Sequence, residues 1–253
     1  MRAASSDAKL DESQARAADT GLKAMIPIGR PFLDYVLSAL ADTGLTEVCI
    51  VIGPEHNQVR EHYAREVKPS RLRIDFAEQQ KPLGTADAVL AAEEFVAGDP
   101  FLVLNSDNYY PLEALRALQS LTEPGLIGFE WKALVDRGNV PPDRVRRFGM
   151  LEIDDHGYLR RILPAAADTG ASGRPVYASM NCWRFEPNIF NLCREVAVSP
   201  RGELELPRAV QLGIDQHRQK YRVVTLSQPV LDMSSRGDIA KVEERLRGTT
   251  VAL

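Results

Sequence analysis

The apolar run Phe-Leu-Val-Leu at residues 101–104 leads directly into the polar residues Asn105, Ser106 and Asp107. A continuous apolar run of this kind is typical of a strand buried on both faces of a parallel sheet. Ligands of open α/β sheets bind at the carboxyl ends of the strands. We therefore expect Asp107 at a binding edge, where a carboxylate can hold Mg²⁺ and Mg²⁺ can hold phosphates. The alternative is an ordinary turn residue at a strand end, a position that Asp favours.

Strand-like and helix-like segments alternate through the first half of the chain, which predicts βαβ units and a mainly parallel sheet. Phe32, Val36 and Leu40 recur at helical spacing, and Gly44 suits the C-cap of that helix. The expected strands of this half are residues 48–52, 72–77 and 101–105, and further helices are expected around residues 59–67, 85–95 and 112–121.

The second half is richer in strands. Residues 149–153 and 158–163 flank the turn Asp154-Asp155-His156-Gly157, which predicts a hairpin. Further strands are expected at 176–185, 221–225 and 230–233, and helices at 187–196, 206–219 and 238–246. We therefore expect an α/β fold, with a Rossmann-like, mostly parallel sheet, helices on both faces and a smaller β-rich region. Residues 1–253 would form a single domain, with residues 1–20 as a flexible loop.

Composition excludes several classes of protein. The formal net charge is −4 and no basic block is present, which argues against a nucleic-acid-binding surface. The cysteines Cys49, Cys182 and Cys193 lie far apart without CxxC spacing, which indicates neither a disulfide framework nor a zinc site. No apolar stretch reaches roughly 18 residues, so no membrane span is expected. Without the apolar core of a secretory signal near residue 1, the expected location is cytoplasmic.

A polar loop that contains glycine lies between the strand at residues 72–77 and the helix expected at 85–95. The amide of Gln79 is both a donor and an acceptor, which suits the edge of a nucleobase. Gly84 permits close approach of the backbone, and a helix that begins near Thr85 presents free N–H groups. Taken alone, this loop could equally be an ordinary entry into a helix.

Together these segments resemble the sugar-phosphate nucleotidyltransferases, the family typified by glucose-1-phosphate thymidylyltransferase. The stretch around Lys23 is similar to the family's Pro-Lys-Pro-Leu-Leu-Pro-Val segment, with Leu22 and Ala24 in place of prolines. A second stretch closely matches the family's Arg-Gly-Glu-Leu-Glu-Ile segment: Arg201-Gly202-Glu203-Leu204-Glu205-Leu206. The resemblance covers nearly the whole chain, from Gly21 to Leu246.

The resemblance implies roles for residues of a nucleotide-binding half, residues 21–130. Gln79, Gly84 and Thr85 would recognise the nucleobase and ribose. Lys23 would contact phosphate and stabilise the charge that develops on it, unless it is a solvated surface lysine. Asp107 would share a catalytic Mg²⁺ with Asp232, which also ends a short apolar run. The alternative for Asp232 is an N-cap or turn residue.

A sugar-phosphate-binding half, residues 131–253, is implied in the same way and would form the smaller β-rich acceptor region. Gly149 would lie close to the sugar, as the glycine of the family's Tyr-Gly pair does. Asn181 falls where the family turns a strand beneath the sugar phosphate, and its amide could bind a hydroxyl or satisfy a buried backbone group. Glu205 belongs to the segment that fixes the region around the sugar site, although its carboxylate could be structural.

The activity implied is Mg²⁺-dependent nucleotidyl transfer from an NTP to a sugar-1-phosphate, which gives a nucleotide sugar and pyrophosphate. The partners would be these two substrates, and neither a nucleic acid nor a membrane is expected as a partner. Assembly into a homo-oligomer is an open alternative. Two other classes remain. One is a non-catalytic regulatory protein that binds sugar nucleotides. The other is a glycosyltransferase with a similar nucleotide-binding half.

The sequence departs from the family pattern at two places. Family members begin with a buried strand and a Gly-x-Gly-Thr-Arg loop that cradles the triphosphate, and neither precedes Lys23. We therefore expect a true start upstream of Met1 and little transferase activity from the chain as numbered. The second departure is Ile162-Leu163-Pro164, where the family usually has Glu-Lys-Pro. The acceptor could therefore be an unusual one.

Overall fold

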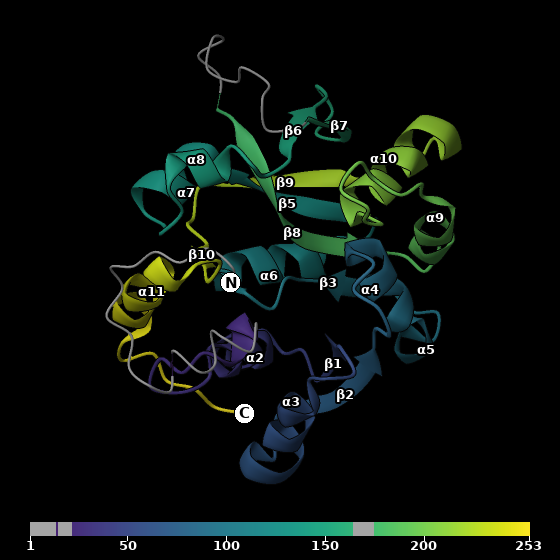
Figure 1. Ribbon diagram of the computed structural model, residues 1–253. Coiled ribbons are helices and arrows are strands. Elements are labelled where there is room, and N and C mark those ends of the chain that lie inside the picture. The colour runs from purple at the N-terminus through teal and green to yellow at the C-terminus, as the bar shows by residue number, and fades with distance from the viewer. Residues whose placement is uncertain (1–13, 15–21, 164–174) are drawn as a thin grey trace.

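The computed structural model describes residue 14 and residues 22–163 and 175–253. Of the three sheets in this part of the chain, Figure 1 shows the two main groups of strands, with helices around them. The smaller group is a parallel pair, β1 (Glu47–Ile52) and β2 (Arg73–Glu78), close to α2 (Phe32–Asp42) and α3 (Asn57–Glu61). Helix α6 (Leu112–Ser120) packs against both α2 and the larger sheet, and so connects the two groups.

The larger sheet contains six strands in the described residues, in the order β7-β6-β8-β5-β9, with β3 also paired to β8. Strands β5 and β9 are parallel, whereas β8 runs antiparallel to β3, β5 and β6. The predicted α/β fold is confirmed. The sheet is mixed because β8, the strand in the middle of the order, runs antiparallel to its neighbours. The bounds are β3 (Phe101–Val103), β5 (Gly125–Glu130), β6 (Met150–Ile153), β7 (Leu159–Leu163), β8 (Tyr177–Phe185) and β9 (Arg222–Leu226).

Most of the remaining elements are short. The helix expected at residues 85–95 is divided at Ala92 into α4 and α5, and α4 packs against α9 and α10. The helical elements are η1 (Lys23–Met25), η2 (His62–Val67), α4 (Thr85–Ala91), α5 (Glu93–Val96), α7 (Trp131–Asp136), α8 (Pro142–Val145), α9 (Ile189–Glu195), α10 (Leu206–His217), η3 (Arg236–Asp238) and α11 (Ile239–Leu246). Two further strands, β4 (Asn108–Tyr109) and β10 (Leu231–Asp232), pair with each other.

Two clusters of buried side chains hold these layers together. The larger one joins α2, α6 and β5, and includes Phe32, Leu115 and Phe129. The smaller one lies between β8 and the α9–α10 pair, where Trp183 stacks on Phe185 with ring centroids 5.4 Å apart. Each such side chain contributes roughly 1.5–3 kcal/mol through burial. The two clusters therefore fix β8, which carries part of the predicted site.

Two sequence expectations fall mainly on residues outside this description. The expected flexible loop at residues 1–20 lies there except for Gln14, which is buried and donates from Nε2 to the Pro27 carbonyl at 3.1 Å. Pro164, the last residue of the Ile162-Leu163-Pro164 segment that departs from the family pattern, also lies outside the described residues. No helix among the described residues is long and apolar enough to span a membrane.

Candidate active site

Lys23 and Asp107 form an ion pair. Lys23 begins the short helix η1, and Asp107 lies in the turn between β3 and β4. The Lys23 Nζ is 3.3 Å from Asp107 Oδ2, and the two side chains are 29% and 25% exposed. Both groups therefore remain accessible to a ligand from solvent.

Asp232 reaches the same place from 125 positions further along the chain. Strand β10 pairs antiparallel with β4, so that Asp232 lies opposite Asn108. The amide of Met233 also donates to the Asp107 carbonyl at 2.8 Å. The structure thus places the backbone segments of Asp107 and Asp232 next to each other. The contact is made by two short antiparallel strands rather than by the ends of parallel strands in the main sheet.

The carboxylate of Asp232 is buried and fully engaged. Its Oδ1 accepts hydrogen bonds from Asn108 Nδ2 at 3.1 Å and Ser234 Oγ at 2.5 Å, and its Oδ2 accepts one from Arg144 Nη1 at 2.7 Å. The side chain of Asn139 also bonds both the N–H and the carbonyl of Asp232. A buried carboxylate requires such partners because its desolvation is otherwise costly.

Arg144 on α8 shares its guanidinium between two acids. The same Nη1 that contacts Asp232 also lies 2.7 Å from Asp238 Oδ2, and Nη2 donates to Ser235 Oγ at 3.1 Å. Partial burial would lower the pKa of this guanidinium, but hydrogen bonds and charges from Asp238 and Asp232 raise it overall. Sequence reasoning did not identify Arg144, Asn108 or Asn139. For these three residues, the only indication in the sequence is that Asn108 directly follows Asp107.

Opposing influences act on the carboxyl group of Asp107. Burial raises the pKa of Asp107, Lys23 opposes that shift, and the nearby charge of Asp232 adds to it. Both burial and the second carboxylate therefore disfavour the ionised form of Asp107. A positive charge between the two acids would relieve this repulsion.

Tyr110 connects the acid cluster to β8. Its buried hydroxyl donates to the Met180 carbonyl at 2.6 Å and also lies 3.3 Å from Asn108 Oδ1. Next to Met180, the backbone of Asn181 has a φ of 53°, a left-handed conformation that is uncommon for a residue other than glycine. The side-chain Oδ1 of Asn181 accepts a hydrogen bond from Trp183 Nε1 at 3.2 Å. Hydrogen bonds through Tyr110 and Asn108 therefore link the predicted sugar-site residue Asn181 to Asp232.

Gly84 and Thr85 form a backbone junction with residues 204–206. Leu204 N donates to the Leu83 carbonyl at 2.7 Å, and Ala86 N donates to the Leu204 carbonyl at 2.8 Å. The hydroxyl of Thr85 accepts a hydrogen bond from the Leu206 amide at 2.9 Å. The structure thus gives Thr85 a partner within the protein and joins the predicted nucleotide-binding loop to the predicted sugar-binding segment.

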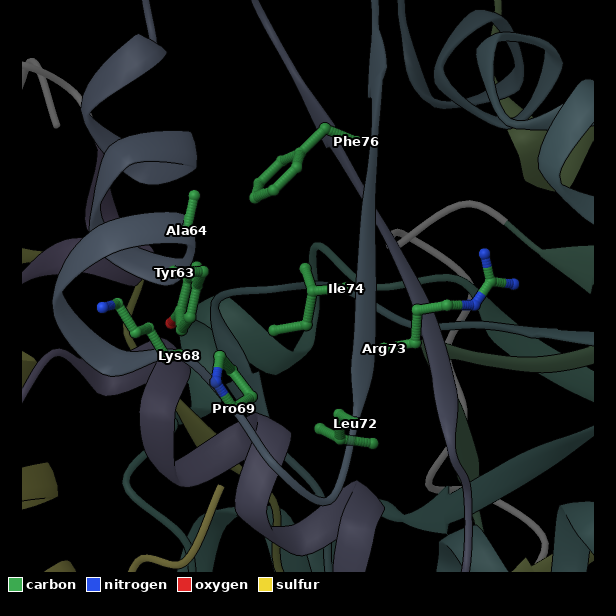
Figure 2. A pocket seen from close by; sticks show the side chains of 8 residues that line it. All are labelled: Tyr63, Ala64, Lys68, Pro69, Leu72, Arg73, Ile74 and Phe76. Carbon is green, nitrogen blue, oxygen red and sulfur yellow. The ribbon is translucent and has the colours of Figure 1, made fainter.

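The amide of Gln79 faces the same junction. Its Nε2 donates to the Gly84 carbonyl at 3.0 Å and to Asp87 Oδ2 at 2.8 Å. Gln79 also lines a hollow of about 360 Å³ with Glu78, Gln80, Lys81, Leu83, Asp87, Leu90 and Ala91. A different hollow, of about 290 Å³, lies between η2 and β2 and includes none of the predicted site residues (Figure 2).

Glu205 and Gly149 have clear structural partners. Glu205 precedes α10 and forms an ion pair with Arg201, with 3.0 Å between Oε1 and Nε. Partial burial opposes ionisation of Glu205, but hydrogen bonds from Ser199 and Arg201 lower its pKa overall. A Cβ added at Gly149 would lie 2.4 Å from Ile162 Cγ2, so close packing of β6 and β7 accounts for this glycine.

The donor set at Asp107 and Asp232 fits Mg²⁺. The described residues contain no group of three or more His, Cys, Asp or Glu side chains placed to hold a metal. Mg²⁺ requires no such cage, since proteins usually hold it through one or two carboxylates, waters and substrate phosphates. Asp107 is accessible and repelled by its neighbour, whereas Asp232 is occupied by Arg144.

The profile of the family described as "Nucleotidyl transferase" matches residues 19–228, most of the chain. The chain belongs to this family. Among its relatives are the low-salt glycan biosynthesis nucleotidyltransferase Agl11 of Haloferax volcanii, 26% identical, and glucose-1-phosphate thymidylyltransferase of Streptomyces griseus, 27% identical. These alignments cover 78% and 91% of this chain, respectively. Thus the resemblance expected from Lys23, Asp107 and the Gly84 loop is confirmed at the level of the family.

The chain spans 54% and 62% of the length of these two nucleotidyltransferases. A crystal structure of UDP-glucose pyrophosphorylase in complex with UDP-glucose superposes with a TM-score of 0.71 at 15% identity. That superposition covers 90% of this chain and 91% of the other, and it shows that the two proteins share a fold.

Proposed function

We propose that this nucleotidyl transferase family member transfers a nucleotidyl group from an NTP to a sugar-1-phosphate and depends on Mg²⁺. The observation that carries the proposal is the convergence of Lys23, Asp107 and Asp232, which come from three distant segments. A cation beside two acids is suited to phosphates that arrive with a metal. The family and the names of the related transferases support the same chemistry.

In this proposal, Asp107 and Asp232 would hold the metal. The chemistry that Mg²⁺ would supply there is neutralisation of charge on the α-phosphate, which would favour attack by the sugar-phosphate oxygen. The ammonium of Lys23 could leave Asp107, bind a phosphate oxygen instead and stabilise the charge that develops on that oxygen. No covalent enzyme intermediate is needed, because positioning and electrostatics supply the rate enhancement.

Substrate recognition is assigned to two neighbouring regions. Gln79 would read the base beside its hollow of about 360 Å³, with Gly84 and Thr85 shaping the loop. Asn181 would orient the sugar phosphate, with Gly149 keeping the adjoining strands close and Glu205 fixing the nearby segment. The junction between residues 83–86 and 204–206 joins the Gly84 loop to the segment that contains Glu205.

The experiment, on the full-length protein, is an assay of pyrophosphate release over the common NTPs and a panel of sugar-1-phosphates, with and without Mg²⁺. Turnover that requires all three components and falls by about 10²–10³ in Asp107→Asn would support the proposal. NTP binding without pyrophosphate release would instead indicate a regulatory protein. Binding of a sugar nucleotide with no use of free NTP would indicate a glycosyltransferase.

A further inference from the structure

We propose that Arg144 is a resident counter-ion that occupies Asp232 in the metal-free protein and yields this carboxylate to a divalent cation, while keeping Asp238 and Ser235. The inference rests on the proposed metal role of Asp107 and Asp232. It adds a positioning residue, Arg144, that sets how tightly the site holds its metal.

The charges around Asp232 show why a counter-ion is present. Asp232 and Asp238 are both buried, and Arg144 is the cation that contacts both of them among the described residues. Two uncompensated buried carboxylates would be strongly destabilising. Arg144 therefore stabilises the fold in the absence of metal. The same contact places a positive charge against an oxygen that a metal would use.

The geometry of the guanidinium leaves its contact with Asp232 open to exchange. Arg144 approaches each carboxylate through the single atom Nη1, rather than gripping Asp232 with two parallel hydrogen bonds. Paired hydrogen bonds are the stronger arrangement, so the contact with Asp232 is comparatively exchangeable. After that exchange, Asp238 Oδ2 at 2.7 Å and Ser235 Oγ at 3.1 Å remain as partners.

The partners that Arg144 would keep are themselves anchored. Asp238 Oδ2 accepts hydrogen bonds from the Ser235 amide and hydroxyl, both at 2.7 Å, in a capping box at η3 before α11. Meanwhile Asn139 and Asn108 hold the backbone and Oδ1 of Asp232 in place. Both acids therefore stay where they are, and only the guanidinium has to shift.

The test measures metal binding directly on the full chain, by titration with Mn²⁺ followed by electron paramagnetic resonance without any nucleotide. Removal of a charge-assisted hydrogen bond that competes with the metal should tighten binding by about tenfold in Arg144→Met. Arg144→Gln, which keeps hydrogen-bonding capacity without charge, should change in the same direction. Arg144→Lys should stay within about threefold of the wild type, because its ammonium still competes.

Arg146→Met is the matched control for loss of one positive charge nearby. Arg146 is exposed and lies 3.9 Å from exposed Asp143. This variant should leave Mn²⁺ affinity within about threefold, since exposed ion pairs contribute little. The thermal midpoint gives a second readout. Saturating Mn²⁺ should raise it more in Arg144→Met than in the wild type, because tighter binding to the native state stabilises that state more.

The outcomes separate this inference from the proposed function. Unchanged or weaker Mn²⁺ binding in folded Arg144→Met and Arg144→Gln, with wild-type binding lost in Asp107→Asn, would overturn the counter-ion role alone. A purely structural Arg144 would give equal destabilisation with and without Mn²⁺. Wild-type Mn²⁺ binding that is unaffected by Asp107→Asn would overturn the metal site and, with it, the basis of the proposed function.

Discussion

Substitution of Gly84 by alanine should destabilise the protein far more than the same change at another glycine with positive φ. Gly84 has φ +123° and ψ −179°, a region that is essentially restricted to glycine. A Cβ there would lie 2.5 Å from the Leu204 carbonyl oxygen and 2.8 Å from its nitrogen. Both atoms belong to the backbone, so a rotamer change cannot relieve the clash.

The expected cost can be estimated from these contacts. The backbone conformation alone costs alanine on the order of 1–3 kcal/mol. The clash would also weaken the two hydrogen bonds of Leu204 with Leu83 and Ala86, each worth about 1 kcal/mol. We therefore expect Gly84→Ala to lower the free energy of unfolding by about 3–5 kcal/mol.

Gly202→Ala is the matched control. Gly202 has φ +81° and lies close in sequence to Leu204, but its added Cβ would meet nothing within 4 Å. It should cost only about 1–2 kcal/mol, the ordinary penalty for a left-handed residue. Urea denaturation followed by circular dichroism measures both variants, provided that the slope with denaturant stays constant. Equal losses for the two variants would show that the junction with Leu204 is not tight and would refute the reasoning.

The remaining predictions test the base contact, the acid cluster and the buried groups. Gln79→Ala should raise the KM for NTP with kcat nearly unchanged, because a base contact acts equally in ground and transition states; steady-state kinetics with lowered kcat and constant KM would contradict it. Asp107→Asn should instead lower kcat by about 10²–10³. Tyr110→Phe should destabilise the protein by about 1–3 kcal/mol in urea, since a buried carbonyl loses its donor. Burial raises the pKa of Cys193 to about 12 and that of Cys182 well above its usual value, so little thiolate forms at pH 8; both should resist a disulfide reagent until denaturant is added, and rapid labelling of the native protein would count against this packing.

Local patterns predicted much of the fold. The helix from Phe32, the strand at 73–78 and the hairpin at 150–163 all form where the sequence indicates them. Strand β5, which lies between β8 and β9, was not predicted, because Gly125 and Gly128 interrupt its apolar pattern. The structure explains Gly125, since an added Cβ would lie 2.5 Å from the Arg222 carbonyl oxygen on β9. That requirement comes from a strand almost a hundred positions away and has no local signal.

Local sequence also predicted some residues of the candidate site and missed others. Asp107 and Asp232 were recognisable because each follows an apolar run, and Lys23 because of its family-like segment. Arg144 is defined only by acids 88 and 94 positions away, so nothing in its own neighbourhood in the sequence marks it. Gly84 and Thr85 are predicted as nucleotide contacts from the sequence, while the contact of this loop with Leu204 and Leu206 emerges only from the folded chain.

The pairing of β4 with β10 also determines at what stage of folding Asp107 and Asp232 come together. Asn108 and Asp232 are 124 positions apart, and the strands that join them contain only two residues each. Closing so long a loop costs entropy that such short strands cannot repay alone, so the cluster depends on prior folding of the surrounding sheet. On the ribosome, Asp107 therefore emerges long before its partner, and an N-terminal fragment lacks the second acid. Assembly of this cluster reports that the chain has folded as a whole.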